Sequence, residues 1–310
     1  MTSQPLGKPV DDSLGEETIL FGGSGFLGQQ ILRNSPKMVS VGRRKPPTPN
    51  RHVSVESLTD LSPLRRVPFR RVIYAIGNSD RPTMQKERHQ PGEPTPFDHH
   101  VIPLIQTLER LMHHGITKFV HCSTILLYDD RRMTLPVSED APLAPYRDKY
   151  VVSKYLAEEL CAFYSRWIPI VNLRLANMYG PAEYTRFDVI HVLIRQLLDK
   201  GRADVQSTKP ERDFIYVEDV ADAVMRILGS DYTGTLNVGT GTMASVGRIT
   251  EILERISGCT IRDLDGPVAG PMQFQCDVSR LRKLIDWRPR YSIEEGVTRT
   301  FEMMKLWRTP

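Results

Sequence analysis

The chain has 310 residues, of which 40% are hydrophobic and 25% are charged, and its formal net charge is +4 at pH 7. This composition is ordinary for a globular protein, and the length suits one large domain or a nucleotide-binding domain with a smaller lobe. The sequence has no run of like charges, no nucleic-acid-binding motif and no apolar run near the ~20 residues of a membrane span, so we expect neither nucleic acid nor a membrane as a partner.

Apolar runs that alternate with helical patterns organise the first half of the chain. The polar segment 1–15 lacks an apolar signal region and is expected to be the flexible N-terminus of a cytoplasmic protein. After it, helical spacing in 101–115 and 150–167 separates the last three of five runs that predict strands, which are 18–22, 38–42, 71–77, 118–124 and 169–176. This alternation predicts an α/β fold whose parallel sheet is covered on both faces. The segment 78–96 is rich in proline and charge and is expected to be a long surface loop.

The second half of the chain has a looser pattern, which we interpret as a smaller C-terminal lobe interleaved with the main sheet. Its predicted elements are a helix over 188–201, a strand and helix over 212–229, a strand over 235–241 and an amphipathic helix over 293–307. We therefore expect a nucleotide-binding domain over 16–176 with 213–240 returning to it. The substrate-binding lobe is then expected to comprise 177–212 and 241–310.

Three glycines in "ILFGGSGFLGQQIL" lie three residues apart, between the first predicted strand and a helical pattern. Gly22, Gly25 and Gly28 would let the backbone approach a pyrophosphate, and the helix start at Phe26 and Leu27 would present free N–H groups to it. This context predicts a dinucleotide site in a doubly wound sheet of the Rossmann type. The alternative is a tight strand-to-helix turn that binds nothing.

The second predicted strand ends without the acidic residue that bonds the ribose hydroxyls of NAD in this fold. Arg43 and Arg44 follow it instead, and two guanidiniums there favour the additional 2′-phosphate of NADP. NADP(H) is therefore favoured over NAD(H) as the cofactor. The alternative is that both arginines are merely solvated.

Two polar patterns suggest catalytic chemistry. Tyr150 and Lys154 form a YxxxK whose spacing places both side chains on one helix face, where the ammonium lowers the pKa of the phenol as a general acid–base requires. Ser123 and Thr124 end the predicted strand over 118–124, at the sheet edge where such folds bind ligands. Each pattern is weak alone, because a surface helix or an ordinary strand end would also contain it.

Together with five further motifs, these patterns resemble the extended short-chain dehydrogenase/reductase family, in its branch of nucleotide-sugar epimerases, dehydratases and 4-ketoreductases. The resemblance spans roughly Ile19 to Met304. In family order, its motifs are GGSGFLG, CSTILLYDD, YRDKYVVSK, LRLANMYGP, ERDFIYVEDVADAV, LNVGTGT and LIDWRPRYSIEEGV. It implies an NAD(P)-dependent enzyme that acts on a nucleotide-diphosphate sugar.

The resemblance also implies a role for each matching residue. Tyr150 takes the place of the acid–base, and Lys154 that of its partner, which also bonds the nicotinamide ribose. Thr124 takes the place of the hydroxyl that orients the reacting oxygen of the substrate, and Ser123 lies beside it on the cofactor side.

Binding residues are implied in the same way. Asn177 and Arg212 match positions that contact the diphosphate of the substrate, and Ser57 and Leu58 lie where the family contacts adenine. A second diphosphate-binding arginine of the family falls near Pro267 here, so one phosphate contact is missing; another arginine such as Arg186 could replace it, or the activated sugar could differ.

Departures from the family pattern narrow the reaction. Ile125 and Leu126 occupy the positions where the dehydratases and sugar-acid decarboxylases of the family have acidic residues, which argues against both reactions. A 4-ketoreductase and a 4-epimerase remain, and the arginine pair places the ketoreductase first. A protein that only senses NADP(H) or acts as a scaffold is a weaker alternative, because it would not need Thr124, Tyr150 and Lys154.

Two further expectations concern metals and assembly. The histidines at 99–100 and 113–114 are sequence neighbours whose side chains diverge by about 100° on a helix, and the four cysteines form no CxxC pair, so no metal is expected. The resemblance implies a homodimer through the helices near 101–114 and 150–167. The apolar stripe on the first of these helices is equally needed to cover the sheet.

Overall fold

The computed structural model describes residues 13–78, 89–90, 92–268 and 270–308. Most of the loop expected over 78–96 therefore lies outside the described residues. Residues 13–15, which were expected to belong to a flexible N-terminus, form a short helix, α1 (Ser13–Glu16), and the hydroxyl of Thr18 donates a hydrogen bond to the carbonyl oxygen of Leu14.

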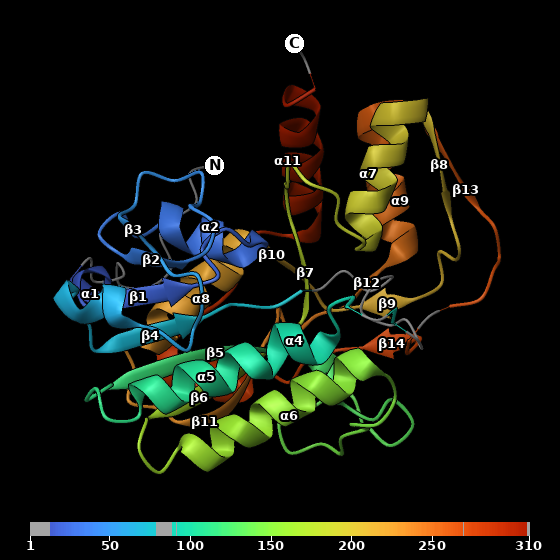
Figure 1. Ribbon diagram of the computed structural model, residues 1–310. Helices are drawn as coiled ribbons and strands as arrows, with labels where there is room; N and C mark the ends of the chain where they lie inside the picture. The colour runs from blue at the N-terminus through green and yellow to red at the C-terminus, as the bar shows by residue number, and fades with distance from the viewer. Residues whose placement is uncertain (1–12, 79–88, 91, 269, 309–310) are drawn as a thin grey trace.

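A parallel sheet of seven strands forms the centre of the molecule (Figure 1). The strand order is β11-β6-β5-β4-β1-β2-β3, and every neighbouring pair is parallel. The strands are β1 (Thr18–Phe21), β2 (Val39–Gly42), β3 (His52–Ser54), β4 (Arg71–Tyr74), β5 (Lys118–Thr124), β6 (Ile170–Leu175) and β11 (Gly234–Val238). The predicted doubly wound sheet of the Rossmann type is thus confirmed. The strand order reverses between β1 and β4, which is where folds of this kind bind ligands.

Helices cover both faces of this sheet, as the buried apolar strands require. On one face, α2 (Phe26–Arg33), α8 (Val217–Leu228) and α10 (Ser279–Ile285) pack into one apolar core. On the other face, η1 (Ser62–Arg66), α5 (Ile102–Leu111) and α6 (Lys149–Tyr164) pack into a second core, and α4 (Pro96–His100) leads into α5. Figure 1 shows α5 and α6 running side by side across this second face.

The lobe has a separate apolar core between three helices that stand apart from the sheet (Figure 1). These are α7 (Val189–Lys200), α9 (Val246–Ser257) and α11 (Ile293–Leu306). Short strands join the lobe to the sheet: β8 (Arg202–Val205) with β13 (Thr260–Asp263), β7 (Asn177–Tyr179) with β10 (Phe214–Tyr216), and β9 (Glu211–Arg212) between β12 (Ala244–Ser245) and β14 (Gln273–Phe274). A single 3-10 turn, η2 (Ile125–Leu127), follows β5.

One strand marks where the chain crosses between lobe and sheet. Phe214 and Tyr216 of β10 pack into the core of the lobe, whereas Ile215 between them packs with α8 against the sheet. Successive side chains of a strand point to opposite faces, so β10 contributes to both cores. The lobe is therefore fixed to the sheet through β10.

Candidate active site

The glycine turn after β1 is packed too closely for side chains. Gly22 has φ +89°, and a Cβ there would lie 2.6 Å from the carbonyl carbon and oxygen of Ala75, which follows β4. A Cβ on Gly28 would lie 2.2 Å from the carbonyl oxygen of Gly22. Glycine is therefore required at both positions, and it lets α2 approach the strand ends closely. This cradle fits a bound dinucleotide.

The start of α2 is prepared for an anion. Gly25 is the N-cap residue and provides no side-chain cap, so the backbone N–H groups at Phe26 and Leu27 donate no hydrogen bond to a capping side chain. The guanidinium of Arg186, from the lobe, stacks 3.6 Å from the centre of the Phe26 ring. Its Nε donates to Asp188 at 2.9 Å and its Nη2 to the carbonyl oxygen of Met178 at 3.2 Å. A positive charge is thus held beside the end of the helix that attracts negative charge.

Two exposed arginines follow β2. Arg43 and Arg44 make no hydrogen bond or ion pair with the part of the chain that the structure describes. Arg43 lies close enough to His99, in α4, to contribute to the lowered pKa of that imidazole, for which burial is the main cause. Both guanidiniums are therefore available to a phosphate at the end of β2.

The predicted adenine contacts follow β3, the strand next to β2. Ser57 is exposed, and its hydroxyl oxygen accepts from the backbone N–H of Thr59 at 3.2 Å. Leu58 packs at the edge of the core on the α5 and α6 face. The fold thus places Ser57 and Leu58 after the strand that neighbours β2, and their contact with adenine stays a prediction.

The three predicted catalytic residues lie where β5 meets α6. Thr124 ends β5 and caps η2, where its Oγ1 accepts from the N–H of Leu126 at 3.2 Å. Tyr150 packs in a small apolar cluster with Leu126 and Leu127, so the phenol ring lies against the turn that Thr124 caps. Lys154 donates from Nζ to the carbonyl oxygen of Cys122 in β5 at 2.9 Å. All three side chains are at least nine-tenths buried.

Among the titratable groups around Tyr150, the ammonium of Lys154 is the principal positive charge. Burial lowers the pKa of Lys154, while Cys122 and Glu158 act in the opposite direction. Two buried histidines lie nearby: burial lowers the pKa of His121 to about 3 and that of His100 well below its usual range, and the Lys154 charge contributes to both. Near neutral pH both imidazoles are uncharged, and the lysine is the cation available to stabilise a phenolate.

The Ser123 hydroxyl is already engaged in the structure. It donates to Glu158 Oε1 at 2.5 Å, and the same carboxylate receives the Nε and Nη2 of Arg174 at 3.1 and 2.7 Å. Both charged side chains are buried, with 6% and 8% exposure. Nη1 of Arg174 donates to the carbonyl oxygen of Glu139. The hydroxyl thus serves a buried ion pair, and the assignment of Ser123 to the cofactor remains a prediction.

The predicted substrate residues meet at the short strands of the lobe. Asn177 begins β7, and both its backbone N–H and its Nδ2 donate to the carbonyl oxygen of Asp213, at 3.0 and 3.2 Å. Arg212 precedes Asp213 and donates from Nη1 to the carbonyl oxygen of Met272 at 2.6 Å. The two residues therefore belong to adjacent segments of one junction, beside the exposed Pro267 segment that carries no second arginine.

Other kinds of site find no support in the described residues. No three side chains of the His, Cys, Asp and Glu types gather there to hold a metal ion. Within the same residues, no helix has the length and apolar character needed to cross a bilayer.

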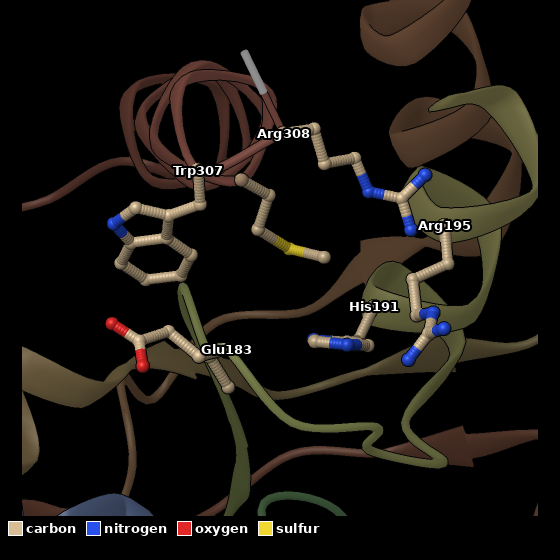
Figure 2. A pocket seen from close by; sticks show the side chains of 7 residues that line it. Glu183, His191, Arg195, Trp307 and Arg308 are labelled. Atoms are coloured by element: carbon tan, nitrogen blue, oxygen red, sulfur yellow. The ribbon is translucent and has the colours of Figure 1, made fainter. Parts of the chain in front are cut away.

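A cavity of about 350 Å³ lies away from the catalytic residues, between α7 and the end of α11 (Figure 2). Its lining includes Glu183, Arg195, Trp307 and Arg308, and the ring of His191 points into it. Both ring nitrogens of His191 are buried and have no hydrogen-bond partner among the described residues. This cavity contains none of the predicted catalytic or binding residues.

Sequence reasoning missed two residues of the site. His100 was considered only as half of a histidine pair, and Glu158 was not considered at all. Glu158 lies one helical turn after Lys154, a spacing visible in the sequence, but its ion pair with Arg174 depends on how α6 crosses β6. The ring of His100 contacts that of Tyr150, 50 residues later in the chain, and no local sequence pattern predicts this contact.

Comparison with known proteins agrees with this geometry. The family model described as "NAD dependent epimerase/dehydratase family" matches residues 18–239. An uncharacterised UDP-glucose epimerase of Bacillus subtilis is 32% identical over 224 residues, 67% of this chain and 69% of the relative. A putative UDP-glucose 4-epimerase of Methanocaldococcus jannaschii is 26% identical and covers 93% of this chain and 98% of its own.

Solved structures resemble the whole chain. A variant of UDP-glucuronic acid 4-epimerase from Bacillus cereus, in complex with UDP-4-deoxy-4-fluoro-glucuronic acid and NAD, superimposes with a TM-score of 0.80 and 25% identity. The match covers 94% of this chain and 99% of that one. The likeness therefore extends through the lobe as well as the sheet.

Proposed function

The chain belongs to the NAD-dependent epimerase/dehydratase family, and we propose that it is a 4-epimerase of a nucleotide-diphosphate sugar that works with tightly held NAD. The observation that carries the proposal is the buried group of Thr124, Tyr150 and Lys154, next to a turn whose Ile125 and Leu126 provide no acid. A hydride can be removed and returned there, but a dehydratase would lack its proton-transfer groups at these two positions. Relatives named as UDP-glucose epimerases support this choice and reverse the order expected from the sequence, which placed a 4-ketoreductase first.

The residues of this chain divide the chemical work. A bound nicotinamide coenzyme supplies the acceptor and donor of a hydride, and the glycine turn, the α2 N-terminus and Lys154 would hold it. Tyr150 takes the proton of the sugar hydroxyl as the ketone forms and returns it afterwards. The ammonium of Lys154 stabilises the phenolate in between, and Thr124 holds the reacting oxygen in line.

The substrate side of the proposal rests on Asn177 and Arg212. Arg212 offers a guanidinium, and Asn177 an amide, at the junction between the lobe and the sheet, where a diphosphate would bridge the two. Because Pro267 replaces the usual second arginine, we expect weaker diphosphate binding than in a pocket with two. Arg186 already bonds Asp188 and Met178 through Nε and Nη2, so it could offer a phosphate only the N–H groups that these bonds leave.

A 4-ketoreductase using NADPH is the second candidate. Arg43 and Arg44 favour it, since both guanidiniums are exposed at the end of β2 and would match a 2′-phosphate. Relatives that are not named as epimerases also match: a GDP-L-fucose synthase of Sinorhizobium fredii is 27% identical over 217 residues, and a CDP-abequose synthase of Salmonella muenchen is 28% identical over 168 residues.

A homodimer is part of the proposal. Four large apolar side chains on or beside α5 and α6 are between 38% and 48% exposed, and they are Ile102, Leu156, Phe163 and Trp167. These helices cover the sheet with their opposite faces. An exposed apolar surface on the two helices would bury well against a second copy.

The decisive experiment identifies the bound cofactor and follows a deuterium label at C4 of the sugar. The purified protein is denatured, and any released nucleotide is identified by mass spectrometry. The native protein is then incubated with UDP-glucose and with UDP-glucuronic acid, each deuterated at C4, and NMR reports the epimer and the label. A 4-epimerase carries stoichiometric NAD, forms the C4 epimer and retains the deuterium at C4.

Two tyrosine variants test whether the measured activity depends on Tyr150. Tyr150→Phe should abolish turnover, whereas Tyr146→Phe, whose phenol is 82% exposed, should leave it unchanged. An empty cofactor site, a preference for NADPH and oxidation of NADPH by a 4-keto sugar would establish the ketoreductase instead. Equal turnover by the protein and its Tyr150→Phe variant would refute the assignment of Tyr150 as the acid–base. Cofactor binding without turnover of either substrate class would refute both enzymes and leave the sensor or scaffold.

A further inference from the structure

We infer that His100, as a neutral imidazole with its proton on Nδ1, is a positioning residue that fixes Tyr150 and Lys154 relative to the loop after β4. The inference rests on the proposed function, because it concerns the same catalytic pair. It adds a residue from α4 that belongs to none of the motifs on which the function was argued.

The position of the imidazole is determined from three sides. His100 is 2% exposed, and its ring stands edge-on to the Tyr150 ring, with centroids 5.3 Å apart and an interplanar angle of 87°. Its Nδ1 lies 2.8 Å from Ser153 Oγ in α6, and its Nε2 lies 3.1 Å from both the N and the O of Asn78. One ring thus contacts the catalytic phenol, its helix and the end of β4.

The hydrogen bonds assign the tautomer. Ser153 has one hydroxyl proton, and its Oγ donates to the carbonyl oxygen of Tyr150 at 2.7 Å. Nδ1 of His100 must then carry the proton and donate to Ser153, which leaves Nε2 to accept from the N–H of Asn78. This arrangement satisfies the hydroxyl, both ring nitrogens and the backbone N–H. With the proton on Nε2 instead, that nitrogen would donate to the carbonyl oxygen of Asn78, and Nδ1 would face a hydroxyl whose proton already bonds Tyr150.

The charges around the ring favour this neutral form. The ring faces Lys154 from α6, His121 from β5 and its neighbour His99 from α4. Burial is the main cause that lowers the pKa of His100, and the Lys154 ammonium adds to it. A neutral ring leaves Lys154 as the cation that acts on the phenol, whereas a charged ring would compete with it.

The packing explains why a smaller side chain would not do. Gly77, just after β4, is so close that a Cβ there would lie 3.3 Å from Cδ2 of His100 and 3.6 Å from Nζ of Lys154. The ring therefore fills the space between this loop and the first turn of α6. Without it, the phenol would lose one wall and the lysine would gain water.

The experiment uses two amide side chains, each of which reproduces the position of one nitrogen of the His100 ring. In His100→Asn the amide nitrogen can replace Nδ1 but cannot reach Asn78; in His100→Gln the longer amide can replace Nε2 but not Nδ1. His113→Gln, at an exposed histidine after α5, is the matched control. Each variant is assayed for kcat and KM, for cofactor affinity and for ionisation of the Tyr150 phenol by ultraviolet difference titration against Tyr150→Phe.

We expect both variants to fold and to bind cofactor and sugar within about twofold of the parent, while kcat falls by roughly 10- to 100-fold because the reacting groups lose their alignment. The pKa of the Tyr150 phenol should rise by about 1, because water around Lys154 screens its charge. Ser153→Ala should shift the phenol in the same direction.

Two results would overturn the inference. One is an unchanged phenol pKa and kcat in folded His100→Asn and His100→Gln; the other is a loss of cofactor affinity or folding that accounts for the whole change, which would make His100 merely structural. The phenol titration needs no sugar. It therefore tests His100 even if the enzyme proves to be a reductase or to have another substrate, which the label experiment decides separately.

Discussion

Buried neutral histidines should limit the stability of this fold in acid; His100 is one of them, and two others give a magnitude. His191 in α7 is 1% exposed, and burial lowers its pKa to about 4; burial likewise lowers the pKa of His121 in β5 to about 3. In the unfolded chain both titrate near ~6.5, so the unfolded state binds more protons between that pH and the folded values. The free energy of unfolding is therefore largest above about pH 6.5 and falls as the pH decreases through this window.

The magnitude follows from these values. Between about pH 7.5 and pH 5, the unfolded state gains about 2 kcal/mol for each histidine, because each folded-state imidazole stays almost fully neutral. The two residues together remove about 4 kcal/mol, a large part of the ~5–15 kcal/mol that stabilises a typical domain. Urea unfolding followed by tryptophan fluorescence at the two pH values measures this loss.

A variant isolates one of the two contributions. His191→Leu loses no hydrogen bond, since neither ring nitrogen has a partner among the described residues, and it should reduce the acid loss by about 2 kcal/mol. His113→Leu, at an exposed position, should not. If His191→Leu loses as much stability in acid as the parent does, the buried neutral imidazole is not the cause and the reasoning fails.

Three further predictions concern the cofactor turn, the buried ion pair and the dimer. Gly28→Ala should lower NAD affinity by at least ~10-fold in calorimetry, because its Cβ would lie 2.2 Å from a carbonyl oxygen of the turn; wild-type affinity would refute the cradle. Glu158→Ala should reduce the free energy of unfolding by ~3–5 kcal/mol because it leaves Arg174 buried and unpaired, whereas Glu159→Ala, exposed one residue later, should cost less than ~0.5 kcal/mol. Phe163→Glu should halve the mass in light scattering; an unchanged dimer would place the interface elsewhere.

The sequence predicted the sheet well because its strands are buried on both faces and therefore appear as continuous apolar runs. β1, β2, β4, β5 and β6 all lie within the predicted runs. β3 was missed, because it is a three-residue edge strand that is only partly buried and has no apolar run. The strands β9, β12 and β14 have two residues each, too few for an alternating pattern to appear in the sequence.

The candidate site was predictable where function depends on local spacing. Tyr150 and Lys154 share a helix face, and the glycine turn is continuous in sequence, so both features could be predicted from the sequence. The Ser123 hydroxyl could not be placed, because Glu158 bonds it from 35 residues away. His100 depends in the same way on the docking of α4 against α6, which no local pattern encodes.

A buried polar network ties the strand that ends in Thr124 to its neighbours in the sheet. Glu158 joins β5 to Arg174 of β6, Arg174 bonds the carbonyl oxygen of Glu139, and the Glu139 carboxylate accepts the backbone N–H of Asn237 in β11 at 3.0 Å. Such buried pairs add little net stability, but each broken link is costly, so they hold their elements in one arrangement.

This network lies on the sheet side of the site. In a 4-epimerase the ketone must turn over and present its other face, while the phenol, the ammonium and the threonine hydroxyl stay fixed. Asn177 and Arg212, which would hold the diphosphate, belong instead to short strands of the lobe. A firmly held catalytic wall opposite a substrate that is anchored only by its diphosphate is what the reaction requires. If the proposed reaction is right, a single arginine at that anchor, with the family's second arginine position falling near Pro267, would leave the sugar free to rotate between the two hydride transfers.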